Sequence, residues 1–463
     1  MTAVTDGMVP GTLVEELLAG VDRSRVLTGE DELRAYSRDQ GPVAQPVEPA
    51  AVVLAESIEE VQHVVRSAHR LGVPLIARGA GTSLSGGAHA VAGCIVLSLE
   101  RMNRILEVRP EDELAMVEPG VINADLNIAV APYGLMYAPD PASHTISTLG
   151  GNVATNAGGL RCAKYGVTRD SVLALDVVLA DGTLIHTGHS TFKGVAGYDL
   201  TALFVGSEGT LGVVVGITVR LKYLPVETRT LAAFFPDIPA AAAGVLAIGA
   251  ARVQPAILEL LDGNTLGILD TAFNSNLAAR GGALLLVQTD GFGAEPEAAV
   301  VRDVLTRRGA TVEAEEGTEA AMLLDLRRNA RGDGVDDDFR VGEDVAVPRS
   351  QLVHYAAELE RMAGDHQVRL RLVAHAGDGN LHPTFWVSSD EGADGVRRLH
   401  AALDESVRVA LALGGTITGE HGIGQYKLRW LSWEQSAEVL VLQRRIKEAF
   451  DPRGILNPGK AIL

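Results

Sequence analysis

The chain has 463 residues, of which 47% are hydrophobic and 21% are charged. This is enough for two or three globular domains and is unlike a disordered protein. The formal net charge of -19 argues against a nucleic-acid partner, because phosphate backbones attract basic surfaces. With only Cys94 and Cys162, the chain offers neither a disulfide framework nor a cysteine-ligated zinc or iron–sulfur cluster.

The N-terminal segment lacks the basic region and the apolar core of a signal peptide. The longest apolar run, over residues 240–251, is too short to span a bilayer. We therefore expect a cytoplasmic protein without a transmembrane segment. Peripheral attachment to a membrane and a homodimer are both left open.

The first strongly patterned helix is expected over residues 57–71. Ser57 and Glu60 fit a capping box, and apolar residues recur at helical spacing until Gly72 ends the helix. A further helix is expected near 121–129, and strands are expected over 73–77, 94–99, 105–108, 114–117, 172–179 and 211–221. These elements indicate an α+β domain that ends near Pro225.

After Pro225 the pattern changes to apolar runs that alternate with longer helices. Helices are expected over 350–362 and 395–413, and strands over 231–235, 256–261, 283–288, 369–374 and 384–387. This rhythm predicts an antiparallel-sheet cap domain with helices on one face. A last helix is expected to be capped by Ser432 and Gln435. The expected domains are 1–224 (core about 46–224), 225–424 for the cap with the substrate and metal sites, and 425–463 as a C-terminal return to the first domain.

Three glycine-rich segments cover residues 78–87, 147–159 and 206–212. Such segments expose backbone N–H groups that can surround a phosphate. The first departs from the G-x-G-x-x-G spacing at Leu84, and no Walker lysine is present. The segments therefore predict a pyrophosphate site of another architecture; the alternative is that each is only a turn in a β-rich domain.

The residues in these segments carry a specific resemblance. Arg78-Gly-Ala-Gly-Thr-Ser, Gly150-Gly-Asn-Val-Ala-Thr-Asn-Ala-Gly-Gly, Tyr165-Gly and Gly206-Ser-Glu-Gly-Thr-Leu-Gly resemble, in order and spacing, the FAD-binding domain of the vanillyl-alcohol oxidase (PCMH) type. Over almost the whole chain the match is to FAD-linked D-2-hydroxy acid dehydrogenases, the branch that contains D-lactate dehydrogenase, D-2-hydroxyglutarate dehydrogenase and the flavin-binding component of glycolate oxidase. The resemblance implies a two-part FAD-binding domain followed by the cap.

The resemblance also implies the FAD contacts. They are Arg78, Gly79, Ala80, Gly81, Thr82 and Ser83 at the pyrophosphate, Thr148, Gly151, Asn152 and Thr155 along the ribityl chain and ring, Glu208 and Val213 towards the adenine, and Pro139 and Asn457. Some relatives tether the flavin through a histidine or cysteine of the first loop. This loop has neither, so we expect FAD to be bound non-covalently.

A candidate metal site lies in the run His375-Ala-Gly-Asp-Gly-Asn-Leu-His382. Asp378-Gly379 predicts a two-residue type I′ turn, which would place His375 directly opposite His382. Two imidazoles so placed can bind one cation; the alternative is a pair of ordinary hydrogen-bonded histidines beside a turn. Glu420 offers a third ligand and leaves positions open for substrate. The resemblance implies a divalent metal, zinc being preferred over manganese or iron(II).

Three further residues are candidates for substrate chemistry. A neutral histidine beside a metal-bound hydroxyl can accept its proton, and the resemblance places the catalytic histidine at His421; the alternative is that His421 orients Glu420. A guanidinium can bind both oxygens of a carboxylate, for which Arg327 is preferred and Arg328 is second. Leu324 replaces the tryptophan usual in this stretch, and a solvated surface remains an alternative for both arginines.

The expected reaction is FAD-dependent oxidation of a D-2-hydroxy acid, D-lactate favoured, to the 2-oxo acid, with hydride transfer to flavin N5. Glycolate and D-2-hydroxyglutarate are alternative substrates. A non-catalytic flavoprotein subunit of an oxidase complex and a metallohydrolase are alternative functions. The electrons are expected to leave to a separate acceptor, such as an electron-transfer protein, an iron–sulfur subunit or a quinone.

Overall fold

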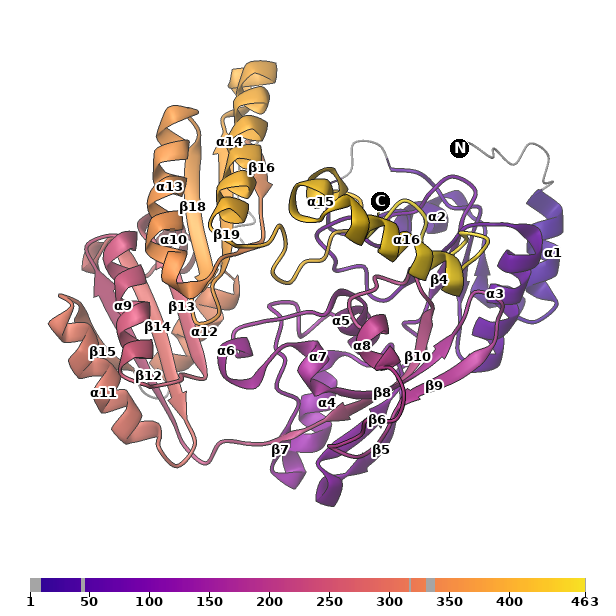
Figure 1. Ribbon diagram of the computed structural model, residues 1–463, viewed down its shortest axis with the longest axis horizontal. Coiled ribbons are helices and arrows are strands. Elements are labelled where there is room, and N and C mark those ends of the chain that lie inside the picture. The colour runs from indigo at the N-terminus through magenta and orange to yellow at the C-terminus, as the bar shows by residue number, and fades with distance from the viewer. Residues whose placement is uncertain (1–9, 43–45, 316–317, 330–337, 463) are drawn as a thin grey trace. The chain divides into compact units, whose positions relative to one another are not determined.

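The computed structural model describes residues 10–42, 46–315, 318–329 and 338–462 (Figure 1). Residues 1–9, the start of the segment in which no signal peptide is expected, lie outside the described part. The chain forms two compact units. The first contains Met1–Ala157, Val167–Leu224 and His421–Leu463, and the second contains Gly158–Gly166 and Pro225–Glu420.

The first unit contains a four-stranded sheet in the order β1-β2-β4-β3. Its strands are β1 (Val26–Leu27), β2 (Ala51–Leu54), β3 (Leu75–Arg78) and β4 (Ile95–Ser98), and its helices are α1 (Pro10–Leu18), α2 (Glu30–Ala35) and α3 (Ile58–Leu71). The strands β2, β4 and β3 run parallel. Every residue of β2 and β4 is buried, as expected for parallel strands covered on both faces.

A five-stranded antiparallel sheet, in the order β5-β6-β10-β8-β9, forms the other half of the first unit. Its strands are β5 (Ile105–Arg109), β6 (Leu114–Val117), β8 (Val172–Val178), β9 (Leu184–Gly188) and β10 (Val213–Arg220). Nearby lie the two-stranded pair β7 (Leu135–Met136) and β11 (Lys222–Tyr223), and the helices α4 (Asn123–Val130), α5 (Leu149–Thr155), α7 (Thr168–Ser171) and α8 (Leu200–Phe204). Two sheets in one unit fit the expected two-part domain.

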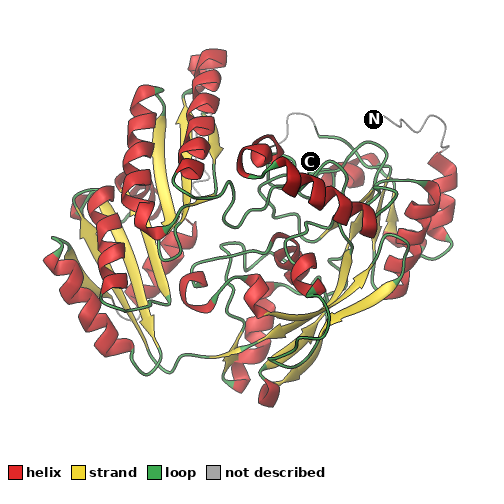
Figure 2. Ribbon diagram, viewed as in Figure 1, coloured by secondary structure: helices red, strands yellow, loops and turns green. Residues whose placement is uncertain are grey.

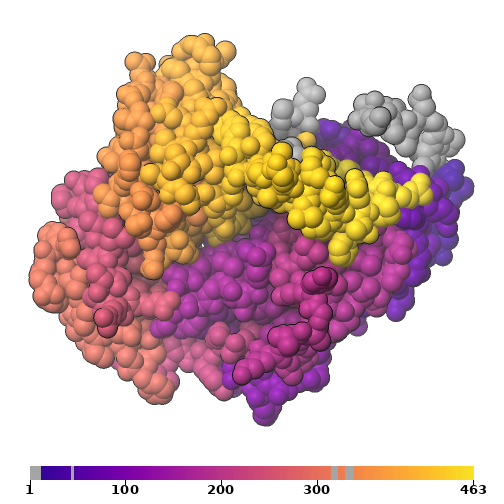
Figure 3. All heavy atoms as spheres, in the orientation of Figure 1, coloured from indigo at the N-terminus to yellow at the C-terminus, as the bar shows by residue number. Residues whose placement is uncertain are grey.

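The C-terminal segment adds α15 (Leu428–Glu434) and α16 (Ala437–Phe450) to the first unit. Leu456 bridges to Leu75 at the edge of the parallel sheet. Helix α16 lies at the surface, where its residues are drawn in yellow (Figure 3), and Leu440 is its one buried side chain.

The second unit is built on an antiparallel sheet of eight strands within the described residues. Seven follow in the order β15-β12-β14-β13-β18-β19-β16, and β17 pairs with β19. The strands are β12 (Thr228–Phe235), β13 (Ile257–Asp262), β14 (Ala283–Asp290), β15 (Thr311–Glu315), β16 (Phe339–Gly342), β17 (Val345–Ala346), β18 (Arg369–His375) and β19 (Asn380–Val387).

Helices cover both faces of this sheet, which corrects the expectation of one covered face. The helices α9 (Ile238–Ala250), α11 (Ala294–Arg307), α13 (Leu352–Asp365) and α14 (Gly392–Ala412) form one layer over the strands (Figure 2). On the opposite face, α10 (Gly263–Phe273) and α12 (Thr318–Asn329) pack on Phe234, Leu284 and Val373. The strands are apolar on both faces, so the sequence contains no signal that one face is open to water. The expected fold class, α+β with an antiparallel cap, is confirmed.

The expected helix over 57–71 is confirmed, but its capping box is only half formed. The Ser57 hydroxyl accepts from the Glu60 N–H at 3.3 Å, whereas the Glu60 carboxylate accepts from the Glu56 N–H at 2.9 Å and pairs with Arg25. The expected cap of the last helix is wrong. Ser432 lies inside α15, and Ser436 caps α16 by accepting from the Val439 N–H.

Replacing Ser57 by Ala is expected to lower the free energy of unfolding of the first unit by about 1 kcal/mol, because the cap of α3 is lost. Replacement by Gly should cost only a few tenths of a kcal/mol. Urea denaturation followed by circular dichroism measures both variants against the wild type. Equal stability of the Ala variant and the wild type would contradict the cap.

Candidate functional site

The three glycine segments meet around the start and the end of α5 in the first unit. Thr148 caps α5, and a Cβ added at Gly79 would lie 2.2 Å from the Thr148 hydroxyl oxygen, so the first two segments touch. At the other end of α5, the Gly206 and Glu208 N–H groups donate to the carbonyls of Val153 and Ala154, at 2.9 and 2.8 Å. Glycine at position 79 thus permits the close backbone approach that a pyrophosphate loop needs.

Polar side chains along α5 are fixed by their own hydrogen bonds. The Asn123 amide donates to the Pro139 carbonyl at 3.0 Å and to Asn152 Oδ1 at 3.2 Å, and Asn152 donates to the Ser147 hydroxyl at 3.2 Å. The Thr155 hydroxyl donates to the Gly151 carbonyl at 3.2 Å. This leaves the orientation of the expected flavin-facing helix well defined.

Asn457 joins the tail to two of the glycine segments. Its amide donates to the Gly87 carbonyl at 3.0 Å and to the Glu208 carbonyl at 2.6 Å. All residues expected to contact FAD belong to the first unit, including Arg78, whose guanidinium donates to the Arg38 carbonyl, and Val213, which begins β10. Their individual contacts with FAD stay predictions.

The histidine hairpin of the second unit has a different register from the expected one. His375 pairs with Asn380, and His382 pairs with Val373, so residues 376–379 form a four-residue loop. A type I′ turn requires positive φ at both central residues, and of Asp378 and Gly379 only Gly379 has it. The shift is two residues, and side chains alternate faces with period two. His375 and His382 therefore still share a face, diagonally, with ring centroids 5.1 Å apart.

Glu420 completes the cluster that the sequence predicts. Its Oε1 lies 3.1 Å from His375 Nε2 and 3.2 Å from His382 Nε2. Three ligands at about 2.0–2.2 Å from one tetrahedral metal lie roughly 3.3 Å apart. The donor set and its spacing therefore fit a divalent cation such as zinc.

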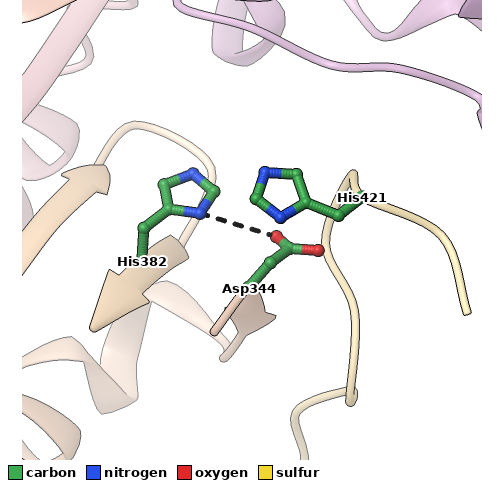
Figure 4. Close-up of side chains that lie close together, drawn as sticks. All are labelled: Asp344, His382 and His421. Atoms are coloured by element: carbon green, nitrogen blue, oxygen red, sulfur yellow. Dashed lines mark ion pairs between the residues drawn. The ribbon is translucent and has the colours of Figure 1, made fainter. Parts of the chain in front are cut away.

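Two further carboxylates, which were not among the expected site residues, lie on the Nδ1 side of the histidine rings. Glu259 Oε1 lies 2.8 Å from His375 Nδ1, and its Oε2 pairs with Arg327 at 2.5 Å; the Glu259 side chain is fully buried. Asp344 Oδ1 lies 3.9 Å from His382 Nδ1 (Figure 4). The Glu259 carboxylate at Nδ1 fixes the His375 ring so that its Nε2 would be the metal-binding atom, whereas 3.9 Å from Asp344 to His382 is an ion-pair distance, too long for a hydrogen bond.

Asp344 also holds the backbone that carries Glu420. Its carboxylate accepts from the N–H groups of Gly419 and Glu420 at 3.0 Å and from the Thr418 hydroxyl at 2.7 Å. His421, also labelled in Figure 4, follows Glu420 directly and is the first residue of the chain's return to the first unit.

The arginines on α12 differ in burial. Arg327 is 5% exposed and paired with Glu259, whereas Arg328 is half-buried, 3.7 Å from Asp325 on its own helix. Arg327 is thus attached to the histidine cluster through Glu259, and binding of a substrate carboxylate by either arginine stays a prediction.

Charges are balanced inside the cluster. Burial alone would lower the pKa of His375, but Glu259 and Glu420 raise this pKa well above its ordinary value. Burial alone would raise the pKa of Glu420, but the charge of His375 and hydrogen bonds from both histidines hold it well below its ordinary value. A metal bound here would compete with a proton for His375.

Glu259 could have been found from the sequence. It is the one charged residue in the apolar run Ala256–Leu261, and a carboxylate in a buried strand needs a partner. Asp344 carries no such signal, because its environment depends on the distant segment 418–420.

Of the described residues, no helix is both long enough and apolar enough to cross a membrane.

Two known domain families match the chain. Residues 49–188 match the family described as "FAD binding domain", and residues 224–461 match "FAD linked oxidases, C-terminal domain". Together they cover most of the chain, and the second match includes the histidine cluster and the C-terminal tail.

Named relatives match over nearly full length. The chain is 41% identical to "Glycolate oxidase subunit GlcD" of Bacillus subtilis, over 92% of this chain and 91% of that one. It is 31% identical to "D-lactate dehydrogenase" of Anaerostipes hadrus, over 94% of each. The solved structure of p-cresol methylhydroxylase with substrate bound has a TM-score of 0.82 at 19% identity and covers 99% of this chain and 98% of that chain, which shows a shared fold.

Replacing Glu259 by Gln is expected to weaken zinc binding roughly 10- to 100-fold, because the outer partner of a ligating histidine is lost. Zinc titration of the EDTA-treated protein, by calorimetry, measures the affinity. Glu358→Gln, at a partly exposed position of α13, is the matched control and should bind zinc as the wild type does. Unchanged affinity in the Glu259 variant would show that this carboxylate does not orient His375 for a metal.

Proposed function

This chain belongs to the family of FAD-linked D-2-hydroxy acid dehydrogenases, and from this premise we propose that it oxidises a small D-2-hydroxy acid, D-lactate favoured, to the 2-oxo acid. One observation carries the proposal beyond the family. Next to His421 in sequence, the second unit gathers His375, His382 and Glu420 into a spacing that suits a divalent metal.

When bound, FAD would supply an acceptor for the hydride of the substrate carbon, and a divalent metal would lower the pKa of a hydroxyl group near it. The residues of the first unit would hold FAD, and His375, His382 and Glu420 would hold the metal with positions left open. Zinc is preferred, because nitrogen and carboxylate ligands at this spacing suit it; manganese and iron(II) are alternatives.

His421 is the proposed acceptor of the hydroxyl proton. A neutral imidazole has an unperturbed pKa near 6.5 and so is available as a base at neutral pH. Its place in the chain, one residue after Glu420, attaches it to the cluster by a single peptide bond. In this arrangement Glu420 would bind the metal while His421 moves the proton.

Arg327 is the proposed partner of the substrate carboxylate. Glu259 occupies one edge of its guanidinium, and a guanidinium has five N–H donors, so others remain for a second carboxylate. Arg328, whose side chain is half-buried, is the alternative. An arginine that binds the carboxylate would recognise a group that lactate shares with longer and shorter 2-hydroxy acids.

Glycolate is the second candidate substrate, because several relatives are named glycolate oxidase subunits. The word subunit in that name favours a separate partner protein, and the proposed role of such a partner is to accept the electrons. The alternative of a non-catalytic subunit would not require the cluster and His421 together.

Replacing His421 by Ala is expected to leave FAD bound and to slow its reduction by substrate roughly 100- to 10,000-fold, because general-base catalysis is lost. Anaerobic stopped-flow absorbance near 450 nm measures the rate. His354→Ala, an exposed histidine of α13, is the control. If the His421 variant reduced its flavin at the wild-type rate, the proton-acceptor role would be refuted.

A panel of D- and L-lactate, glycolate and D-2-hydroxyglutarate tests the substrate. D-lactate is expected to give the highest kcat/KM in an anaerobic dye-reduction assay, and L-lactate almost none, because two anchored groups fix the face of the carbon. Treatment with EDTA should abolish the activity, and added zinc should restore it. A preference for glycolate or hydroxyglutarate would replace D-lactate, and equal use of both lactates would contradict the proposed anchoring.

A further inference from the structure

The loop that follows Glu420 is bound by two residues of the glycine segments, within the first unit. The Ser85 hydroxyl donates to the His421 carbonyl at 2.9 Å. The Ser85 carbonyl in turn accepts from the N–H groups of Gln425 and Tyr426 at 2.9 and 3.0 Å. One residue of the segment 78–87 therefore holds both ends of the loop 421–426.

Glu208, in the segment 206–212, holds the middle of the same loop. Its Oε1 accepts from the Ile423 N–H and its Oε2 from the Gly424 N–H, both at 2.8 Å. Glu208 is 7% exposed and Ser85 is fully buried. Burial raises the pKa of Glu208 to about 7, although these two N–H groups oppose the rise. The two bonds are thus the compensation for a buried carboxyl group.

At Gly424 the backbone of the loop leaves no room for a side chain. Gly424 has φ of +53°, and a Cβ there would lie 2.1 Å from the Ser85 carbonyl oxygen. The backbones of Gly424 and Ser85 thus approach each other closely, and this contact requires glycine at position 424. A loop held at both ends and in its middle keeps its first residue, His421, in one place.

We propose that Glu208 and Ser85 are positioning residues for the reaction, which fix the backbone of His421 to the two glycine segments expected to bind FAD. The inference rests on the proposed function, because a fixed position of His421 matters only if His421 accepts the proton. It also gives the Glu208 side chain a role other than the one implied by the resemblance, in which Glu208 lies towards the adenine of FAD. Both carboxylate oxygens are instead engaged by the loop.

The test compares Glu208→Gln, Ser85→Ala and His421→Ala in the FAD-loaded protein. Glu208→Gln turns an amide group towards one of the two loop N–H groups, and we expect flavin reduction to slow about tenfold, since small displacements of a reacting group are costly. Ser85→Ala removes one hydrogen bond, for which about fivefold is expected. In the His421→Ala background neither change should slow reduction further, because residues that act as one unit are not additive.

Hydrogen exchange supplies the readout that does not depend on activity. Peptides that contain Ile423 and Gly424 should exchange faster in Glu208→Gln, while the absorbance of bound FAD is retained. Glu118→Gln is the matched control, since Glu118 is also buried and accepts a backbone N–H, that of Arg104 at 2.8 Å. It should leave exchange of the loop and flavin reduction unchanged.

Loss of FAD with unchanged loop exchange would overturn the proposal and make Glu208 a cofactor contact. Faster exchange with unchanged flavin reduction, or effects that add to that of His421→Ala, would also overturn it. If His421→Ala itself reduces flavin normally, the proposed base fails. Faster exchange in Glu208→Gln would then still support Glu208 as the residue that holds the loop, and unchanged exchange would refute that too.

Discussion

Two buried carboxylates hold the loop 418–424 by its backbone N–H groups, and the candidate site depends on them. Asp344 accepts from Gly419 and Glu420 within the second unit. Glu208 accepts from Ile423 and Gly424 within the first. The peptide bond between Glu420 and His421 lies between these two anchors. A carboxylate that accepts two N–H groups is strongly directional, so each anchor defines its half of the loop through the backbone, and Asp344 also accepts from the Thr418 hydroxyl.

Charge compensation governs the histidine cluster in a similar way. Glu259, Arg327 and His375 are all nearly inaccessible to water, and an unpaired charge there would cost several kcal/mol. Each charge has a neighbour of opposite sign, so the cost of burial is shared along a chain from Arg327 through Glu259 and His375 to Glu420. Removing one member leaves the next uncompensated, which links the position of Arg327 on α12 to that of His375, a proposed metal ligand, on β18.

The sequence predicts the local features of this protein better than its long-range ones. The helix at 57–71, the strands on either side of the histidine hairpin and the cluster of His375, His382 and Glu420 follow from periodicity, spacing and resemblance. The predicted two-residue turn of the hairpin was wrong, because a dipeptide does not fix the register of two strands. The register differs from the expected one by two residues, so His375 and His382 still share a face. The cap Ser436 was missed because Ser432 and Gln435 have the spacing of a capping box, although Ser432 lies inside α15. Asp344 and Ser85 were missed because their partners lie about 75 and 340 residues away in sequence.

The segment Gly158–Gly166 belongs to the second unit although it lies between two parts of the first unit in sequence. This affects the order in which the protein can fold during synthesis and where the chain can be cut into fragments. Tyr165 donates to Asp290 at 2.6 Å, Lys164 pairs with the same carboxylate, and Gln254 donates to the Ala163 carbonyl at 2.7 Å. During synthesis this short stretch leaves the ribosome well before its partners on β14 exist. A gene fragment that encodes only 225–420 would leave Asp290 without its lysine and tyrosine partners. Such a fragment is therefore incomplete, because part of the second unit, Gly158–Gly166, lies in sequence between two parts of the first unit.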